Sequence, residues 1–183
     1  MKKAIFFILL FAAAANLSAQ TFTEWLDPAV NEITRLPMRA SYFAYESAEA
    51  ARKGDPRVSE RFLDLDGTWK FSWVRNADQR PADFFRTDYD DRSWSTMPVP
   101  GLWELNGYGD PQYLNIGYAW REQFENNPPY VPIKENHVGS YRREIEIPAS
   151  WSDKQVIARF GSVTSNIYLW VNGRSIRKPR KQN

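Results

Sequence analysis

Carboxylates are the side chains of this sequence that could act on a covalent bond, because a pair of them can serve as general acid and general base. The candidates are Asp64, Asp66, Asp90, Asp91, Glu104 and Asp110. All but Glu104 lie in turn-like stretches near Gly, Pro or Ser, where Asp is favoured for local hydrogen bonding. His137 is the only histidine and cysteine is absent, so neither a Ser–His triad nor a structural zinc site is predicted. The sequence therefore predicts no catalytic residue and no metal ligand in this chain.

Binding chemistry is better represented, in a long loop over residues 106–143 that is dense in Asn, Pro, Gly and aromatic residues. Amide side chains both donate and accept hydrogen bonds, and amphipathic rings can stack on sugar faces, so this composition suits a polyhydroxylated ligand. The loop aromatics are Trp103, Tyr108, Tyr113, Tyr118, Trp120, Phe124 and Tyr130. Their two interpretations stay open at this point: stacking on a sugar, or packing the loop against another domain.

Short alternating stretches predict the elements that would hold this loop. Trp69, Phe71 and Trp73 alternate with polar residues, and residues 141–147, 156–160 and 167–171 repeat the same period of two. Because each stretch is short and bounded by turn residues, the sequence predicts an all-β sandwich. Trp69, Trp73, Trp94, Trp151 and Trp170 are predicted to pack in its core.

Helical turns and a hairpin complete the predicted elements. Residues 25–39 and 46–52 are predicted to form short helical or turn segments near the amino terminus. Asn172–Gly173 is a strong signal for a tight hairpin turn, because both central positions of the favoured turn need positive φ. Residues 174–183 then lack alternation and length, so we expect the hairpin to begin without being completed.

The amino-terminal residues predict export. Two lysines precede an apolar run and a small residue at position 19, which is typical of a cleaved signal peptide over residues 1–19 and predicts a periplasmic or secreted protein. Residues 20–173 hold 17 basic and 22 acidic residues, a net charge of −5, and the remaining basic residues lie at the two ends. Such a distribution predicts no nucleic-acid partner, which requires a basic face, and no membrane partner is predicted either.

Several blocks, in order along the chain, resemble the amino-terminal sugar-binding domain of glycoside hydrolase family 2, in particular its β-galactosidase branch. The blocks are Trp25-Leu26-Asp27-Pro28, Leu65-Asp66-Gly67-Thr68-Trp69-Lys70-Phe71, Pro98-Val99-Pro100 with Trp103, Gly107-Tyr108-Gly109-Asp110-Pro111, Tyr113-Leu114-Asn115, Pro128-Pro129-Tyr130-Val131-Pro132, Gly139-Ser140-Tyr141 and Phe160-Gly161-Ser162-Val163 leading to Trp170-Val171-Asn172-Gly173-Arg174.

The resemblance implies an all-β, jelly-roll (galactose-binding-like) sandwich with short amino-terminal helical turns, incomplete at its carboxyl end. It divides the chain into four parts: the signal peptide, an extension over residues 20–60 that packs on the sandwich, the sandwich over residues 61–173, and a basic divergent tail over residues 174–183. In such enzymes the sandwich is followed by an immunoglobulin-like domain and a catalytic barrel. Two barrel glutamates about 5–5.5 Å apart do the chemistry with retention.

The family's sugar contact falls on Asn115, with Tyr113 and Trp120 as further candidates. The implied partners are a β-galactoside and the catalytic barrel of the parent enzyme. No cofactor is expected in this chain, although related full-length enzymes use Mg and Na. After Asn172-Gly173-Arg174 the sequence departs from the family pattern, and an acidic residue expected there is missing.

We therefore expect an amino-terminal fragment of a β-galactosidase-like enzyme, inactive by itself and ended by a frame break or early stop. Two alternatives are a free-standing carbohydrate-binding module and a fragment that complements a separate catalytic chain.

Overall fold

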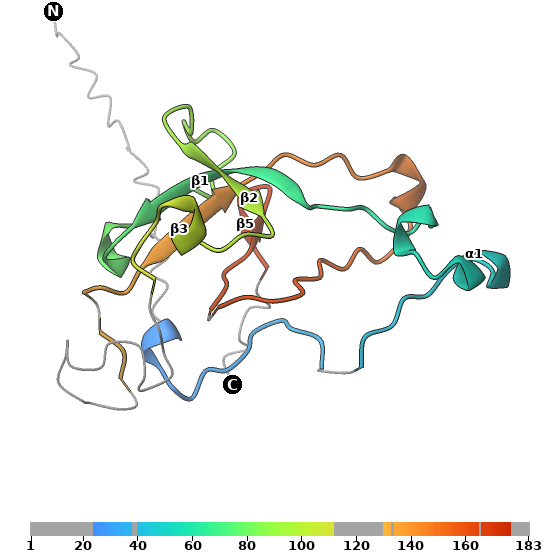
Figure 1. The fold of residues 1–183 in the computed structure, drawn as a ribbon, viewed down its shortest axis with the longest axis horizontal. Helices are drawn as coiled ribbons and strands as arrows, with labels where there is room; N and C mark the ends of the chain where they lie inside the picture. Colours follow the sequence, from blue (N-terminus) through green and yellow to red (C-terminus); the bar gives the residue numbers. More distant parts are fainter. Residues whose placement is uncertain (1–23, 38–39, 112–129, 133, 165, 177–183) are drawn as a thin grey trace, which may run out of the picture.

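A computed structural model describes residues 24–37, 40–111, 130–132, 134–164 and 166–176. Its centre is a three-stranded antiparallel sheet with strand order β2-β1-β3 (Figure 1), formed by β1 (Gly67–Val74), β2 (Ser95–Val99) and β3 (Val138–Arg142). A separate hairpin pairs β4 (Trp170–Val171) with β5 (Arg174–Ser175). Strands joined by short helical turns confirm the predicted all-β class.

The central strand β1 is where the sequence alternates most clearly between aromatic and polar residues. Its first half pairs with β2, from Gly67 opposite Val99 to Phe71 opposite Ser95. Its second half pairs with β3, from Lys70 opposite Arg142 to Val74 opposite Val138. Because β2 is an edge strand, it can accommodate Pro98, which lacks a backbone donor.

The core lies on the aromatic face of β1. Phe71 is 1% exposed and Met97 is fully buried, while Ala77, just beyond the end of β1, is 3% exposed. The Phe71 ring centroid lies 4.6 Å from that of Tyr141 on β3 and 4.8 Å from that of Tyr108. This small cluster is the part of the described structure that most resembles a protein interior.

Helix α1 (Ala48–Lys53) forms where the sequence predicts it, at the end of the molecule opposite the sheet (Figure 1). The Ser47 side chain accepts a hydrogen bond from the backbone N–H of Ala50, and Gly54 ends the helix in the left-handed conformation. Single 3-10 turns form at Pro56–Val58 (η2), Ala77–Gln79 (η3), Glu104–Asn106 (η4) and Ala149–Trp151 (η6).

The helical segment predicted over residues 25–39 is restricted to one 3-10 turn, η1 (Glu24–Leu26), in its described part. Pro28 disfavours helical dihedrals at Asp27, which precedes it. The Asp27 carboxylate instead accepts a hydrogen bond of 2.9 Å from the backbone N–H of Ala29 and fixes a turn.

The predicted turn at Asn172–Gly173 is confirmed, since the φ angles of these residues are 48° and 77°. The expectation that the hairpin is not completed is wrong. Ser175 pairs with Trp170 and Arg174 pairs with Val171, and the backbone N–H of Ile176 donates to the Leu169 carbonyl at 2.9 Å. A return strand of two residues suffices because the turn itself fixes the register.

The strand predicted over residues 141–147 is present only as far as Arg142, and the strands predicted over 156–160 and 167–169 do not form in the described structure. Alternation requires one buried face, yet neighbouring Val156 and Ile157 are 50% and 54% exposed. A strand persists only where its backbone groups pair with another strand. The apolar pattern of this segment therefore has no sheet to join among the described residues.

Gly139 on β3 is closely covered by aromatic rings. A Cβ atom there would lie 2.6 Å from the Trp103 ring and 2.7 Å from the Phe71 ring, whereas a Cβ at Gly161 would meet nothing within 4 Å. We expect Gly139→Ala to lower the free energy of unfolding of the full chain by about 1–3 kcal/mol through overpacking. The matched Gly161→Ala should change it by less than about 0.5 kcal/mol. Urea unfolding checks both variants, and equal effects would contradict this packing.

Candidate functional site

The three sequence-predicted contacts with sugar, Tyr113, Asn115 and Trp120, lie outside the described residues. The described structure instead shows how the loop that carries them is attached to the sheet. We call the two described ends of this loop its bases. The first base is the stretch Tyr108–Asp110, and the second base is the stretch Glu135–His137. Both bases contact the end of β1 and the residues that follow it.

The first base is held by aromatic packing and glycine turns. The Tyr108 ring centroid lies 4.8 Å from that of Phe71 and 6.3 Å from that of Trp73. Gly107 and Gly109 have φ angles of 87° and 75°, a region that side chains disfavour. These two glycines form turns at the beginning of the loop.

The second base is held by hydrogen bonds and by one ring. The backbone N–H of Glu135 donates to the Asn76 side chain at 3.0 Å, and the Asn136 amide donates to the Pro132 carbonyl at 2.9 Å. The His137 ring centroid lies 4.9 Å from that of Trp73. The only histidine of the sequence thus packs against β1 as a structural residue.

Arg75 joins the two bases. Its guanidinium lies 3.1 Å from the Glu135 carboxylate and 3.7 Å from the Asp110 carboxylate. These side chains are well exposed, so the ion pairs contribute little stability. Their effect is geometric, because one cation directly after β1 ties together the beginning and the end of the loop. Sequence reasoning missed Arg75, since no motif marks a cation whose partners are distant along the chain.

Two loop aromatics whose role the sequence left open pack on the protein's own sheet. Trp103 covers Gly139, and its indole N–H donates to the Tyr141 hydroxyl at 2.6 Å. Burial raises the pKa of Tyr141, and the hydrogen bond from Trp103 opposes that rise. Tyr108 packs on Phe71 as described above, whereas Tyr130 is 64% exposed. Trp103 and Tyr108 therefore fix the chain at the beginning of the loop against the sheet.

Asp64 and Asp90, two of the candidate carboxylates, have pKa values shifted in the wrong direction for a general acid. The backbone N–H of Asp66 and then the Arg57 side chain lower the pKa of Asp64, and the Arg92 side chain lowers that of Asp90. A glycoside-cleaving acid needs the opposite shift, toward the protonated form. These groups are charged turn residues, as their sequence context predicts.

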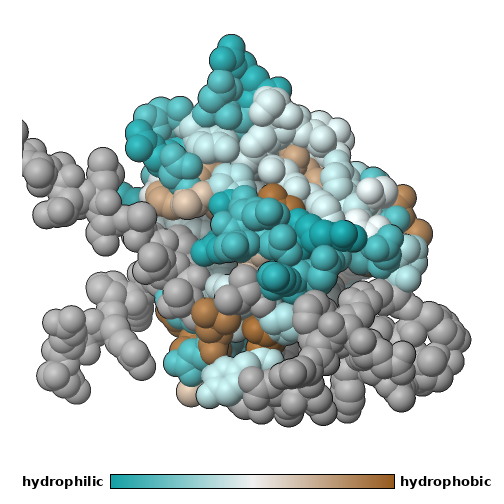
Figure 2. Space-filling model, turned by 90° about the vertical axis from the view of Figure 1, so that its left-hand side faces the viewer, coloured by the Kyte–Doolittle hydropathy of each residue, from teal (hydrophilic) through white to brown (hydrophobic). Residues whose placement is uncertain are grey.

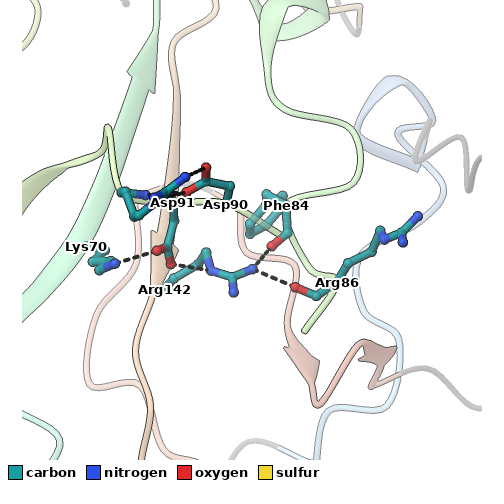
Figure 3. Close-up of polar contacts among 7 residues, drawn as sticks. Lys70, Phe84, Arg86, Asp90, Asp91 and Arg142 are labelled. Carbon is teal, nitrogen blue, oxygen red and sulfur yellow. Dashed lines mark hydrogen bonds and ion pairs between the residues drawn. The ribbon is translucent and has the colours of Figure 1, made fainter. Parts of the chain in front are cut away.

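Asp91 differs from the other candidate carboxylates in its position, because its side chain contacts two strands of the sheet (Figure 3). Lys70 and Arg142 oppose each other directly on β1 and β3, and Asp91 lies between them. One carboxylate oxygen pairs with the Lys70 ammonium, and the other accepts a bond of 2.8 Å from Arg142 Nε. Arg142 also donates to the backbone carbonyls of Phe84 and Arg86, the latter at 2.9 Å.

This arrangement neutralises a repulsive pair and fastens the segment before β2 to the sheet. Hydrogen bonding from Lys70 and, after it, from Arg142 lowers the pKa of Asp91, despite an opposing effect of partial burial. The Arg142 guanidinium carbon also lies 5.5 Å from the centre of the Tyr89 ring. The segment over residues 84–91 is thereby held against the polar face of β1.

The remaining surface carries no candidate metal centre in the part of the chain that the structure describes. Within it, no group of three His, Cys, Asp or Glu residues could hold a metal ion, and no helix has the length and hydropathy to cross a membrane. Hydrophilic residues cover most of the described face in Figure 2, with hydrophobic residues in separate patches.

Comparison with known proteins identifies the sheet and its loop. The pattern of the sugar-binding domain of glycosyl hydrolases family 2 matches residues 62–182, which include every strand and both bases of the loop. The chain belongs to glycosyl hydrolase family 2. The match begins shortly before β1 and continues past the β4–β5 hairpin, so both sheets lie within the family's sugar-binding domain, whereas η1, α1 and η2 precede it.

Curated relatives support this family assignment along most of the chain. A β-galactosidase of Priestia megaterium is 36% identical over 156 residues, and one of Halalkalibacterium halodurans is 37% identical over 150 residues. They cover 85% and 81% of this chain, which spans 15% of the length of each. A β-galactosidase large subunit of Leuconostoc lactis is 30% identical, and the chain spans 26% of it.

The position of Asp91 predicts a dependence of stability on pH. Because its pKa is lowered in the folded state, its contribution is complete above the ordinary value of about 3.9 and is lost as the pH falls through the folded value. We expect Asp91→Asn to lower the free energy of unfolding by about 1–3 kcal/mol at pH 7. The deficit should shrink in strong acid, where the wild-type carboxyl is protonated.

Urea unfolding of both proteins at neutral and acidic pH measures this difference. Asp153→Asn is the control, because Asp153 pairs only with the adjacent Lys154 on the exposed surface and should change stability by less than about 0.5 kcal/mol. A deficit for Asp91→Asn that is independent of pH would show that the carboxylate charge is not what stabilises this contact.

Proposed function

We propose that this chain supplies the sugar-binding portion of a β-galactosidase that hydrolyses terminal β-galactosides. The observation that carries the proposal is the match of the family's sugar-binding domain to the sheet and to both bases of the loop. The relatives that match over most of the chain are named β-galactosidases. A loop rich in Asn and aromatic residues, fixed at both ends to a rigid sheet, suits recognition of hydroxyl groups.

In this proposal the chain binds and another part of the enzyme catalyses. Retaining hydrolysis needs a general acid and a nucleophile about 5–5.5 Å apart. The described Asp64, Asp90 and Asp91 are each engaged by cations or backbone donors that keep them charged. The two catalytic carboxyl groups would therefore come from a barrel domain that partners this chain, and Asn115 would reach toward its mouth to bind a sugar hydroxyl.

The same proposal covers the finer fold and the cellular location. A jelly-roll sandwich would give the apolar segment over residues 143–169 the second sheet that its alternation requires, and would cover side chains such as Ile145 and Phe160, which are 46% and 45% exposed. The apolar run within residues 1–19 would direct the chain to export, into the periplasm or the medium.

Complementation of a separate catalytic chain is the second candidate. A relative named as a large subunit favours it, because that name describes an enzyme divided between chains. The free-standing carbohydrate-binding module also gains support, since the completed β4–β5 hairpin removes the main sequence argument against it.

The decisive residue for the proposed function is Asn115. In an enzyme that joins this chain to a catalytic portion, Asn115→Ala should lower kcat/KM for an aryl β-galactoside by the equivalent of one or two hydrogen bonds, about 1–3 kcal/mol. The fold should be unchanged. Asn126→Ala, in the same loop but outside the family's sugar contact, is the matched control and should leave kcat/KM unaltered. If kcat/KM were the same for both variants, the loop would be a structural contact only.

A further inference from the structure

A pocket opens where β1 and β2 separate. The paired register ends with Phe71 opposite Ser95, yet β1 continues to Val74. A cavity of about 310 Å³ occupies this divergence, lined by the continuing strand, by the residues that lead into β2 and by Tyr108. Its volume falls at the lower end of the range of about 300–1,000 Å³ for ligand sites, which suits a single sugar unit.

The lining of this pocket is aromatic and hydroxylic, and the described residues that form it include no charged side chain. Tyr89 and Trp94 supply rings, and Ser72, Ser93 and Ser95 supply hydroxyl groups. None of these three serine hydroxyls forms a hydrogen bond with another described residue. Free hydroxyls beside aromatic faces offer both a donor–acceptor set and a stacking surface.

The charges closest in sequence are already engaged. Asp91 pairs with Lys70 and Arg142, and Asp90 accepts bonds of 2.8 and 2.7 Å from the Arg92 guanidinium. A charged ligand would enter this pocket without a partner of opposite charge on its wall and would lose its hydration. The chemistry therefore favours an uncharged ligand that carries several hydroxyl groups.

The aromatic wall is fixed before any ligand binds. Tyr89 lies under the Arg142 guanidinium, and its ring centroid is 5.7 Å from that of Trp94. The Trp94 ring centroid in turn lies 6.1 Å from that of Phe84, and the Phe84 carbonyl accepts a hydrogen bond from Arg142. A wall held in this way loses little conformational entropy when a ligand binds.

We propose that this pocket is a second carbohydrate site, which takes one neutral sugar unit and is separate from the loop that carries Asn115. The serine hydroxyls bind the sugar hydroxyls, and the Tyr89–Trp94 wall packs against the sugar ring. The site goes beyond the proposed function because the described residues that line it are not the family's sugar contacts. It would hold a saccharide on the chain independently of turnover.

The test uses the full chain and methyl β-D-galactopyranoside as the probe. Calorimetric titration gives the affinity, and amide NMR shifts at Ser93–Ser95 report its location. We expect the double variant Ser93→Ala, Ser95→Ala to bind about tenfold more weakly, in line with the loss of one or two hydrogen bonds. Ser93→Trp, which fills the pocket, should abolish binding. A negatively charged methyl galacturonide should bind more weakly than the neutral probe.

Two controls separate this site from the loop. Ser152→Ala removes an exposed hydroxyl outside the pocket and should leave the affinity unchanged. Asn115→Ala removes the loop contact, and the sugar-induced amide shifts at Ser93–Ser95 should persist in it. Affinity lost in Asn115→Ala and kept in both pocket variants would overturn the second site while supporting the loop. Absence of any binding by the wild-type chain at about 50 mM probe, above the millimolar range of weak sites, would also overturn it.

Discussion

The described structure depends most on the two ion pairs that the Asp91 carboxylate forms. This carboxylate lies between Lys70 and Arg142, which face each other across β1 and β3 and would otherwise repel. Through Arg142 the same network holds the Phe84 and Arg86 carbonyls, so the chain leading into β2 is fastened to the sheet. One group thereby joins two strands and one long connection without any disulfide.

Two different surfaces follow from the two faces of β1. The aromatic face packs Trp103 and Tyr108 under the loop, and Arg75 joins the beginning and end of that loop just beyond the strand. The polar face receives Asp91, and residues from both faces of β1 border the pocket where β2 diverges. A short strand can serve both because its side chains alternate between faces.

Local rules were enough to predict the elements whose stability is local. Alternation located β1, the helical segment predicted over residues 46–52 formed as α1, and Asn172–Gly173 located the hairpin turn. The strands predicted over residues 143–169 were wrong because a strand also needs a partner, which period-two alternation does not specify. Arg75 could not be predicted for the opposite reason, since its partners are adjacent only after the sheet has formed.

In the proposed function, this chain recognises a sugar and leaves bond cleavage to another part of the enzyme. Turnover of an aryl β-galactoside by the purified full chain tests it most directly. We expect no hydrolysis above background, because cations or backbone donors lower the pKa values of Asp64, Asp90 and Asp91, whereas a general acid needs a raised pKa. Steady turnover that survives purification and disappears in Asp64→Asn or Glu104→Gln would contradict it.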